Sequence, residues 1–257
     1  MRLESRVVML FLLGVQMTAS LVLAQRSRCA DCHYAHPEAP APRHLADWER
    51  SAHGRNNLGC EECHGGNAST FESFLAHQGM LDSHDPASPT LSRNLPETCG
   101  ACHMGPLVAF RESTHYELLR QGDDTAPTCS TCHGSVAANF LSPKTLAKRC
   151  ESCHGEGEVA YRIEHPILGR LLLEKVLEVR KLLDHSKHLI RHIKDEPRRR
   201  RLEETYRQAE IPLTEAAQAG HSFVFDKLQE YLDVARLRAK NLLGELANPS
   251  ADHVPSS

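Results

Sequence analysis

The chain has 257 residues, with 30 lysines and arginines against 33 aspartates and glutamates, and a formal net charge of −3. It lacks the global positive charge that would indicate a nucleic-acid partner, and we expect none. Aromatic residues make up only 5% of the sequence, whereas there are 10 cysteines and 17 histidines. Side chains alone therefore supply a poor conventional core.

Residues 1–24 predict a secretory signal peptide. Arg2 and Arg6 precede an apolar stretch, and Val22 and Ala24 stand three and one residues before a cleavage site after Ala24. The alternative is an uncleaved membrane anchor, since the apolar stretch is just long enough to span a bilayer although polar residues dilute it. We therefore expect a periplasmic, cell-surface or secreted protein, with the anchored form as the alternative.

The next region, 25–157, contains the pattern Cys-x-x-Cys-His five times, and these copies use every cysteine of the chain. This pattern attaches c-type haem: the two thiols form thioethers to the porphyrin, and the adjacent histidine becomes the proximal iron ligand. Zinc sites and disulfides also use paired cysteines, but neither requires a histidine after each second one. The thiols are Cys29, Cys32, Cys60, Cys63, Cys99, Cys102, Cys129, Cys132, Cys150 and Cys153, and the proximal histidines are His33, His64, His103, His133 and His154. We predict five covalently attached c-type haems with their iron.

Prolines and glycines are frequent in this region, and long apolar periodicity is absent. Such a segment cannot bury enough side-chain surface to offset its ordering entropy without a ligand. We expect a pentahaem cytochrome domain over 25–157, built of short helices and loops around stacked haems. By analogy with metal-coupled folding, we expect its apoprotein to be largely unfolded.

From Pro166 onward the pattern becomes helical, and Pro197 is expected to end the first long helix. Its apolar seam is Leu172, Val176, Val179, Leu183, Ser186, Ile190 and Ile193. A weaker helix is expected over 198–209, with Pro212 interrupting it. A further helix ends near Pro249, and its seam is His221, Phe225, Leu228, Leu232, Ala235, Ala239, Leu242 and Leu246.

The fold class predicted from these patterns is mainly α. A haem-packed region of short helices and loops precedes a C-terminal helical domain over 158–249, followed by a disordered tail over 250–257. The long amphipathic helices are expected to form a hairpin or bundle, packed on each other or against copies in a homo-oligomer.

Twelve histidines remain after the proximal ligands, so second axial ligands are in excess supply. Met80 and Met104 are the methionines beyond the signal segment, which gives methionine ligation few candidates. Bis-histidine ligation gives lower potentials than histidine–methionine ligation.

Three segments resemble the distal-histidine segments of multihaem cytochromes: 48–54 with His53, 76–80 with His77, and 110–115 with His115. That lineage includes tetrahaem electron carriers of nitrifiers, pentahaem nitrite reductases and octahaem hydroxylamine oxidoreductases. The resemblance implies that all three are distal ligands, and that the histidines of the Ser-x-His segments, His53 and His115, ligate haems bound elsewhere in the sequence. Two features depart from the family: Val136 follows Cys-His-Gly-Ser where relatives often have a histidine, and no Cys-x-x-Cys-Lys motif is present.

The remaining distal ligands are open at this stage. His221 lies on an apolar seam, where an imidazole needs a partner, and its segment is similar to one after the last haem of larger relatives. His165 lies just past the fifth motif and immediately before Pro166. The rivals are His36, His44 and, more weakly, His84, whereas His185, His188 and His192 share a helix face that we expect to be solvated.

Five haem motifs within about 130 residues favour an exported electron-transfer protein whose haems form a chain. Its expected partners are a quinol-oxidising membrane cytochrome and a terminal reductase or extracellular acceptor. One alternative is a small reductase or oxidase of nitrogen or sulfur oxyanions with one open haem site, and another is a structural subunit that binds a complex through its helices. Whether the chain is an enzyme is therefore left open, and no catalytic residue is assigned.

Overall fold

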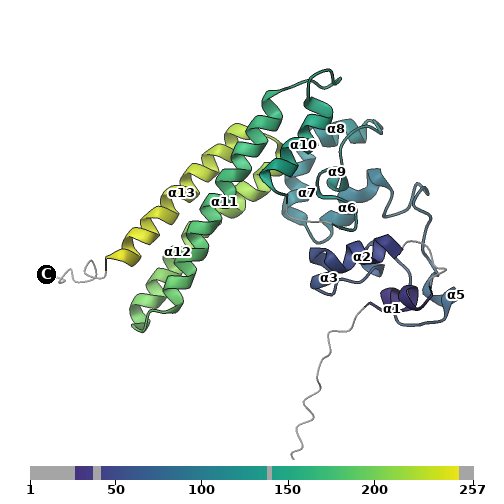
Figure 1. Ribbon diagram of the computed structural model, residues 1–257, viewed down its shortest axis with the longest axis horizontal. Helices are drawn as coiled ribbons and strands as arrows, with labels where there is room; N and C mark the ends of the chain where they lie inside the picture. The colour runs from purple at the N-terminus through teal and green to yellow at the C-terminus, as the bar shows by residue number, and fades with distance from the viewer. Residues whose placement is uncertain (1–26, 37–41, 138–140, 249–257) are drawn as a thin grey trace, which may run out of the picture.

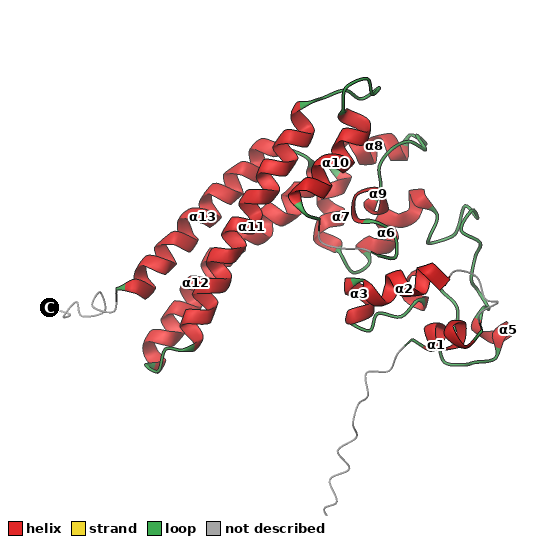
Figure 2. Ribbon diagram, in the orientation of Figure 1, coloured by secondary structure: helices red, strands yellow, loops and turns green. Residues whose placement is uncertain are grey.

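The computed structural model describes residues 27–36, 42–137 and 141–248. These residues form 13 α-helices and two 3₁₀ helices and contain no strand, which confirms the mainly α prediction (Figure 2). The expected signal peptide and the expected tail lie outside the described residues.

The motif region consists of short helices joined by loops, as the sequence predicts. Nine of its α-helices have 4–9 residues and the tenth has 12. They are α1 (Arg28–Ala35), α2 (Pro42–Arg50), α3 (Ala52–Arg55), α4 (Glu61–His64), α5 (Ser73–Ala76), α6 (Leu95–Gly100), α7 (Met104–Arg111), α8 (Thr114–Arg120), α9 (Cys129–His133) and α10 (Pro143–His154), with the 3₁₀ helix η1 (Ser92–Asn94) before α6.

Three long helices form a bundle after the last motif (Figure 1). They are α11 (Glu164–Arg191), α12 (Glu196–Ala219) and α13 (Phe225–Ala247), with the 3₁₀ helix η2 (Gly220–Ser222) between the last two. Each of the three contacts the other two. The hydrophobic core of the described residues lies entirely within them, from Leu172 to Leu242.

Both predicted seams lie in this core or are buried beside it, except His221, which lies in η2 before α13 begins at Phe225. Val179 and Leu183 on α11 are almost fully buried, and so are Leu232 and Leu242 on α13. Val176 and Ile193 are partly buried against the same cluster. The alternating spacing of four and three therefore identified the buried faces of α11 and α13 correctly, and the bundle form of the prediction is confirmed.

The expected interruption at Pro212 is wrong, because α12 continues through it to Ala219. A proline inside a helix removes the hydrogen bond to the carbonyl four residues earlier, here that of Gln208. The Arg238 guanidinium of α13 donates to this carbonyl oxygen at 2.8 Å. Pro212 is itself buried in the bundle. Tertiary contacts thus compensate for the local defect that the sequence pattern suggested.

The motif region has almost no side-chain core of its own. Its buried hydrophobic residues are Ala30, Leu45, Phe110, Ala126 and Ala147, of which three are alanines. Large apolar side chains are exposed in the same region, among them Phe71, Phe74, Leu75, Met80, Leu81, Met104 and Val108. The short helices of this region are therefore not held together by a side-chain core of their own.

Candidate haem sites

The five motif histidines each face a different histidine from elsewhere in the chain. Their ring centroids lie 5.7–6.1 Å apart. The pairs are His33 with His77, His64 with His44, His103 with His53, His133 with His221, and His154 with His115. The partner histidines come from α2, α3, α8, η2 and the end of α5, so five separate elements supply them.

This separation fits an iron atom between the rings. An iron about 2 Å from one nitrogen of each imidazole, as metal–imidazole bonds require, places the two ring centroids roughly 6 Å apart. Direct packing of two rings allows closer approach, down to roughly 4.5 Å. Histidine pairs whose spacing matches a bridged metal, beside two thiols each, therefore fit c-type haem. The exposed apolar side chains of the region supply surface that a porphyrin can cover.

The two Ser-x-His segments have the same local structure. Ser51 begins α3: its hydroxyl accepts a hydrogen bond from the Gly54 N–H at 3.0 Å and donates to the Trp48 carbonyl at 2.6 Å. Ser113 begins α8 in the same way, with acceptance from Tyr116 N–H at 3.2 Å. Both serines are buried. A serine N-cap thus fixes the start of a short helix, and the histidine two residues later is held on its first turn.

Backbone carbonyls select the tautomer of several of these histidines. The Nδ1 atoms of His77 and His221 lie 2.8 Å and 3.0 Å from the carbonyl oxygens of Ser73 and Ala217. The Nδ1 atom of His154 lies 2.6 Å from the Ala160 carbonyl. Since a carbonyl only accepts, each Nδ1 carries the proton. The lone pair is then on Nε2, the nitrogen left to bind a metal.

Burial favours the neutral imidazole at His53, His64, His115 and His221. It lowers the pKa of His53, His115 and His221 below the usual histidine range, and the facing proximal imidazole contributes in each case. The pKa of His64 is lowered by burial and by its neighbour His44. A neutral imidazole is the form that ligates metal. The buried Nδ1 of His115 has no hydrogen-bond partner among the described residues.

Four of the five histidines expected as distal ligands face a motif histidine: His53, His77, His115 and His221. The fifth, His165, lies beside His154 at a centroid distance of 4.8 Å, edge to face, and also contacts Phe225 at 5.5 Å. A distance of 4.8 Å is shorter than the metal-bridged spacing of roughly 6 Å. The structure therefore brings both His115 and His165 to the fifth motif, with metal-bridging geometry at His115.

The histidine that faces the second motif is His44, which the sequence offered only as a rival. Its helix, α2, is held to the loop before Cys60 by a hydrogen bond of 2.9 Å from the Trp48 indole to the Leu58 carbonyl. His36 ends α1, three residues after His33. Residues three apart lie on one helix face, so His36 cannot oppose His33. That argument was available from the sequence, whereas the approach of His44 to His64 depends on the fold.

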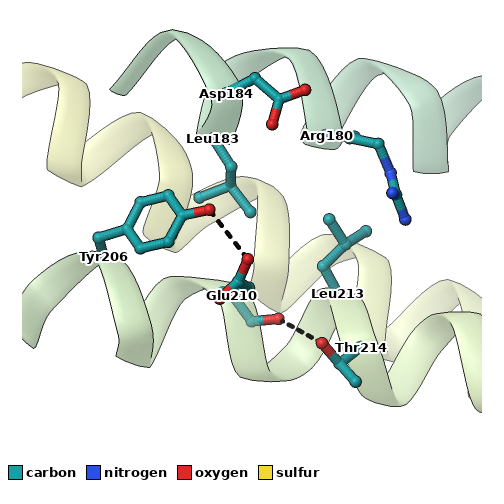
Figure 3. A pocket seen from close by; sticks show the side chains of 7 residues that line it. All are labelled: Arg180, Leu183, Asp184, Tyr206, Glu210, Leu213 and Thr214. Carbon is teal, nitrogen blue, oxygen red and sulfur yellow. Dashed lines mark hydrogen bonds between the residues drawn. The ribbon is translucent and has the colours of Figure 1, made fainter. Parts of the chain in front are cut away.

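Other candidates lie away from these pairs. His188 and His192 contact each other on α11, at 4.6 Å between centroids, and no group of three metal-binding side chains occurs among the described residues. A hollow between α11 and α12 holds a hydrogen bond of 2.9 Å from the Tyr206 hydroxyl to Glu210 (Figure 3). The residues that line it include none of the motif cysteines or histidines.

Paired thiols with facing imidazoles form the ligand set of a multihaem c-type cytochrome. Over 127 residues the chain is 35% identical to the C-type polyheme cytochrome OmcB of Geobacter sulfurreducens, in strain DL-1 / KN400 and in strain ATCC 51573 / DSM 12127 / PCA. The match covers 44% of this chain and 15% of each relative's length. The likeness supports a multihaem c-type cytochrome with covalently bound haem and a general role in electron transfer.

No family model and no solved structure matches the chain. Among the described residues, no helix has the length and apolar character needed to cross a bilayer.

Proposed function

We propose that the protein carries electrons through five c-type haems, each held by two cysteines and two histidines. The distal ligands are His77 for the first motif, His44 for the second, His53 for the third, His221 for the fourth and His115 for the fifth. The observation that carries this proposal is the one-to-one pairing of motif histidines with other histidines at 5.7–6.1 Å.

When bound, haem supplies one-electron redox chemistry at its iron. The chain sets where each group lies and which ligands it has. A haem held at each site by two cysteines and two histidines would have no iron position left for a substrate. Five such pairs favour an electron carrier over a reductase or oxidase, which requires an open position.

The hydrogen bonds to Nδ1 prepare the distal histidines to bind iron. The carbonyls of Ser73 and Ala217 hold their imidazoles in one orientation and increase the basicity of Nε2. A more basic ligand pair stabilises ferric iron and lowers the reduction potential. We therefore propose low-potential centres, suited to exchange with a quinol-oxidising membrane cytochrome on one side and a terminal reductase or extracellular acceptor on the other.

The proposal includes export, because the predicted signal segment leads the chain to the compartment where c-type haem is attached in bacteria. The proposal also includes self-association through the long C-terminal helices. Light scattering of the holoprotein, which measures its oligomeric state, tests this.

The test is a count of axial ligand sets in the oxidised holoprotein. Electron paramagnetic resonance and near-infrared magnetic circular dichroism should show five low-spin bis-histidine haems per chain and no high-spin ferric haem. Four such centres and one high-spin centre would contradict the proposal, and turnover of nitrite or hydroxylamine would then support the enzyme alternative. Mass spectrometry of the intact chain, which should carry five haems, checks the cofactor number independently.

A further inference from the structure

We infer that the five haem sites form one unbranched file in the order of their motifs along the chain. Electrons would then move between the Cys29–His33 site and the Cys150–His154 site through the three sites between them. The inference rests on the proposed function and adds the spatial order, which motif spacing alone leaves open. It is carried by contacts that join each motif to the next.

The first and second sites are joined at their thiols. The Ser27 hydroxyl lies 3.8 Å from the Cys60 sulfur, and the Cys29 sulfur lies 3.8 Å from the Glu61 carboxylate. The segment after the second motif also binds the helix that leads to His77, since the Asn67 N–H donates to the Ala76 carbonyl at 2.8 Å. The distal ligand of the first site is thus positioned by the second motif.

The second and third sites are joined through their distal ligands. His44 lies on α2 and His53 on α3, and these two helices contact each other. The buried Ser51 connects them, because it caps α3 and donates to the Trp48 carbonyl of α2. On the thiol side, Cys63 is an electrostatic neighbour of Cys99 and Cys102.

The third and fourth sites are joined on both sides. Helices α6 and α9, which carry Cys99 and Cys129, are in contact, and the two sulfur atoms are electrostatic neighbours. Helix α7, which begins directly after His103, contacts η2, which contains His221. The approach is close: a Cβ atom on Gly105 of α7 would lie 2.7 Å from the Gln218 side chain.

The fourth and fifth sites are joined by α9 and α10, which contact each other. Cys132 is an electrostatic neighbour of Cys150 and Cys153. Two residues after His221, the Phe223 ring packs edge to face on His115 at 4.5 Å. Phe223 has a φ of +58°, a left-handed conformation that is strained for a non-glycine residue, so the surrounding structure must hold it there.

The arrangement of the helices agrees with this order. From α1 and α5 at the lower right of Figure 1, the motif region rises through α2 and α3 to α6, α7 and α9, and then to α10 beside the bundle. The first site therefore lies at the end away from the bundle. The fifth lies against it: a Cβ atom on Gly169 of α11 would lie 3.8 Å from the Cys150 sulfur.

The test is proton NMR of the fully reduced holoprotein, in which bis-histidine ferrous haems are low-spin and diamagnetic. Each haem is assigned through nuclear Overhauser effects to its own cysteine and histidine side chains. We expect inter-haem effects between consecutive motifs only, which gives four contacts, with one neighbour each for the first and fifth haems. An effect between non-consecutive haems, or a missing consecutive contact, would overturn the file.

A pair of variants sharpens the result. Cys99→Ala with Cys102→Ala removes the third haem and should leave two separate haem pairs. The matched control, Cys29→Ala with Cys32→Ala, removes the first haem and should leave an uninterrupted run of four. If either variant fails to fold, the spectrum of the unmodified protein decides the order. The same spectra distinguish failure of the proposed function from failure of the order. A high-spin ferrous haem, which shifts and broadens signals in the one-dimensional spectrum, would contradict the proposed function. Five low-spin haems with other inter-haem contacts would overturn the order alone.

Discussion

Replacement of His44 by alanine tests the distal ligand that the sequence did not single out. In the structure His44 is the histidine that faces His64, at 5.7 Å between ring centroids. Its removal should leave the second haem five-coordinate while the other four keep both imidazoles. Since one site of five changes, about one fifth of the total haem should become high-spin.

The matched control is His165→Ala. His165 lies 4.8 Å from His154, closer than a metal-bridged pair, whereas His115 faces the same ring at 6.0 Å. The control should therefore keep all haems low-spin. Spin quantification by electron paramagnetic resonance at low temperature measures both variants. The geometric assignment is refuted if His44→Ala stays fully low-spin, or if His165→Ala produces one fifth high-spin haem.

Three further outcomes are expected. Leu232 lies in the bundle core and is 1% exposed, so Leu232→Ala should lower the free energy of unfolding by roughly 2–5 kcal/mol. Leu237 is 61% exposed, and Leu237→Ala should change that free energy by less than about 0.5 kcal/mol. Urea unfolding followed by circular dichroism measures both variants, and equal losses would contradict the core assignment. Haem-free protein should lose the helical signal of α1–α10 and keep that of α11–α13, which contain 28, 24 and 23 residues; native-like helicity of the whole chain would count against a haem-dependent core. Replacing Arg199 and Arg200 by serine should leave the affinity for a redox partner unchanged, because both arginines pair with glutamates on their own helix. A tenfold increase in the dissociation constant would show that they bind a partner instead.

Local patterns predicted the features of this chain that depend on local chemistry. Two thioethers and one histidine ligand to the same haem require a fixed spacing of cysteine, cysteine and histidine. Each Cys-x-x-Cys-His motif can therefore be recognised from five consecutive residues. The seams on α11 and α13 were equally readable, because a helix repeats its buried face every three or four residues. The histidines of the two Ser-x-His segments were singled out by resemblance to distal-histidine segments of multihaem cytochromes, and the serine cap with the helix it starts is a local unit that such a short motif can represent.

The sequence failed where the answer depends on distant contacts. Pro212 breaks the local pattern, and the guanidinium of Arg238, on another helix, satisfies the Gln208 carbonyl that it leaves open. His44 carries no local sign that distinguishes it from other polar-loop histidines. Its approach to His64 follows from the position of α2, which depends on the Trp48 hydrogen bond to Leu58 and on packing with α3.

The bundle and the motif region also depend on each other more than the predicted boundary at residue 158 suggests. The long helices carry a side-chain core that is complete without cofactor, yet the turn between α12 and α13 presents His221 to His133 and Phe223 to His115. That turn is held by α7, which follows the third motif directly. A self-sufficient core thus fixes the position of a ligand for a region that has almost no core of its own. In a file of haems, one rigid end of this kind can set the geometry from which the remaining sites are built.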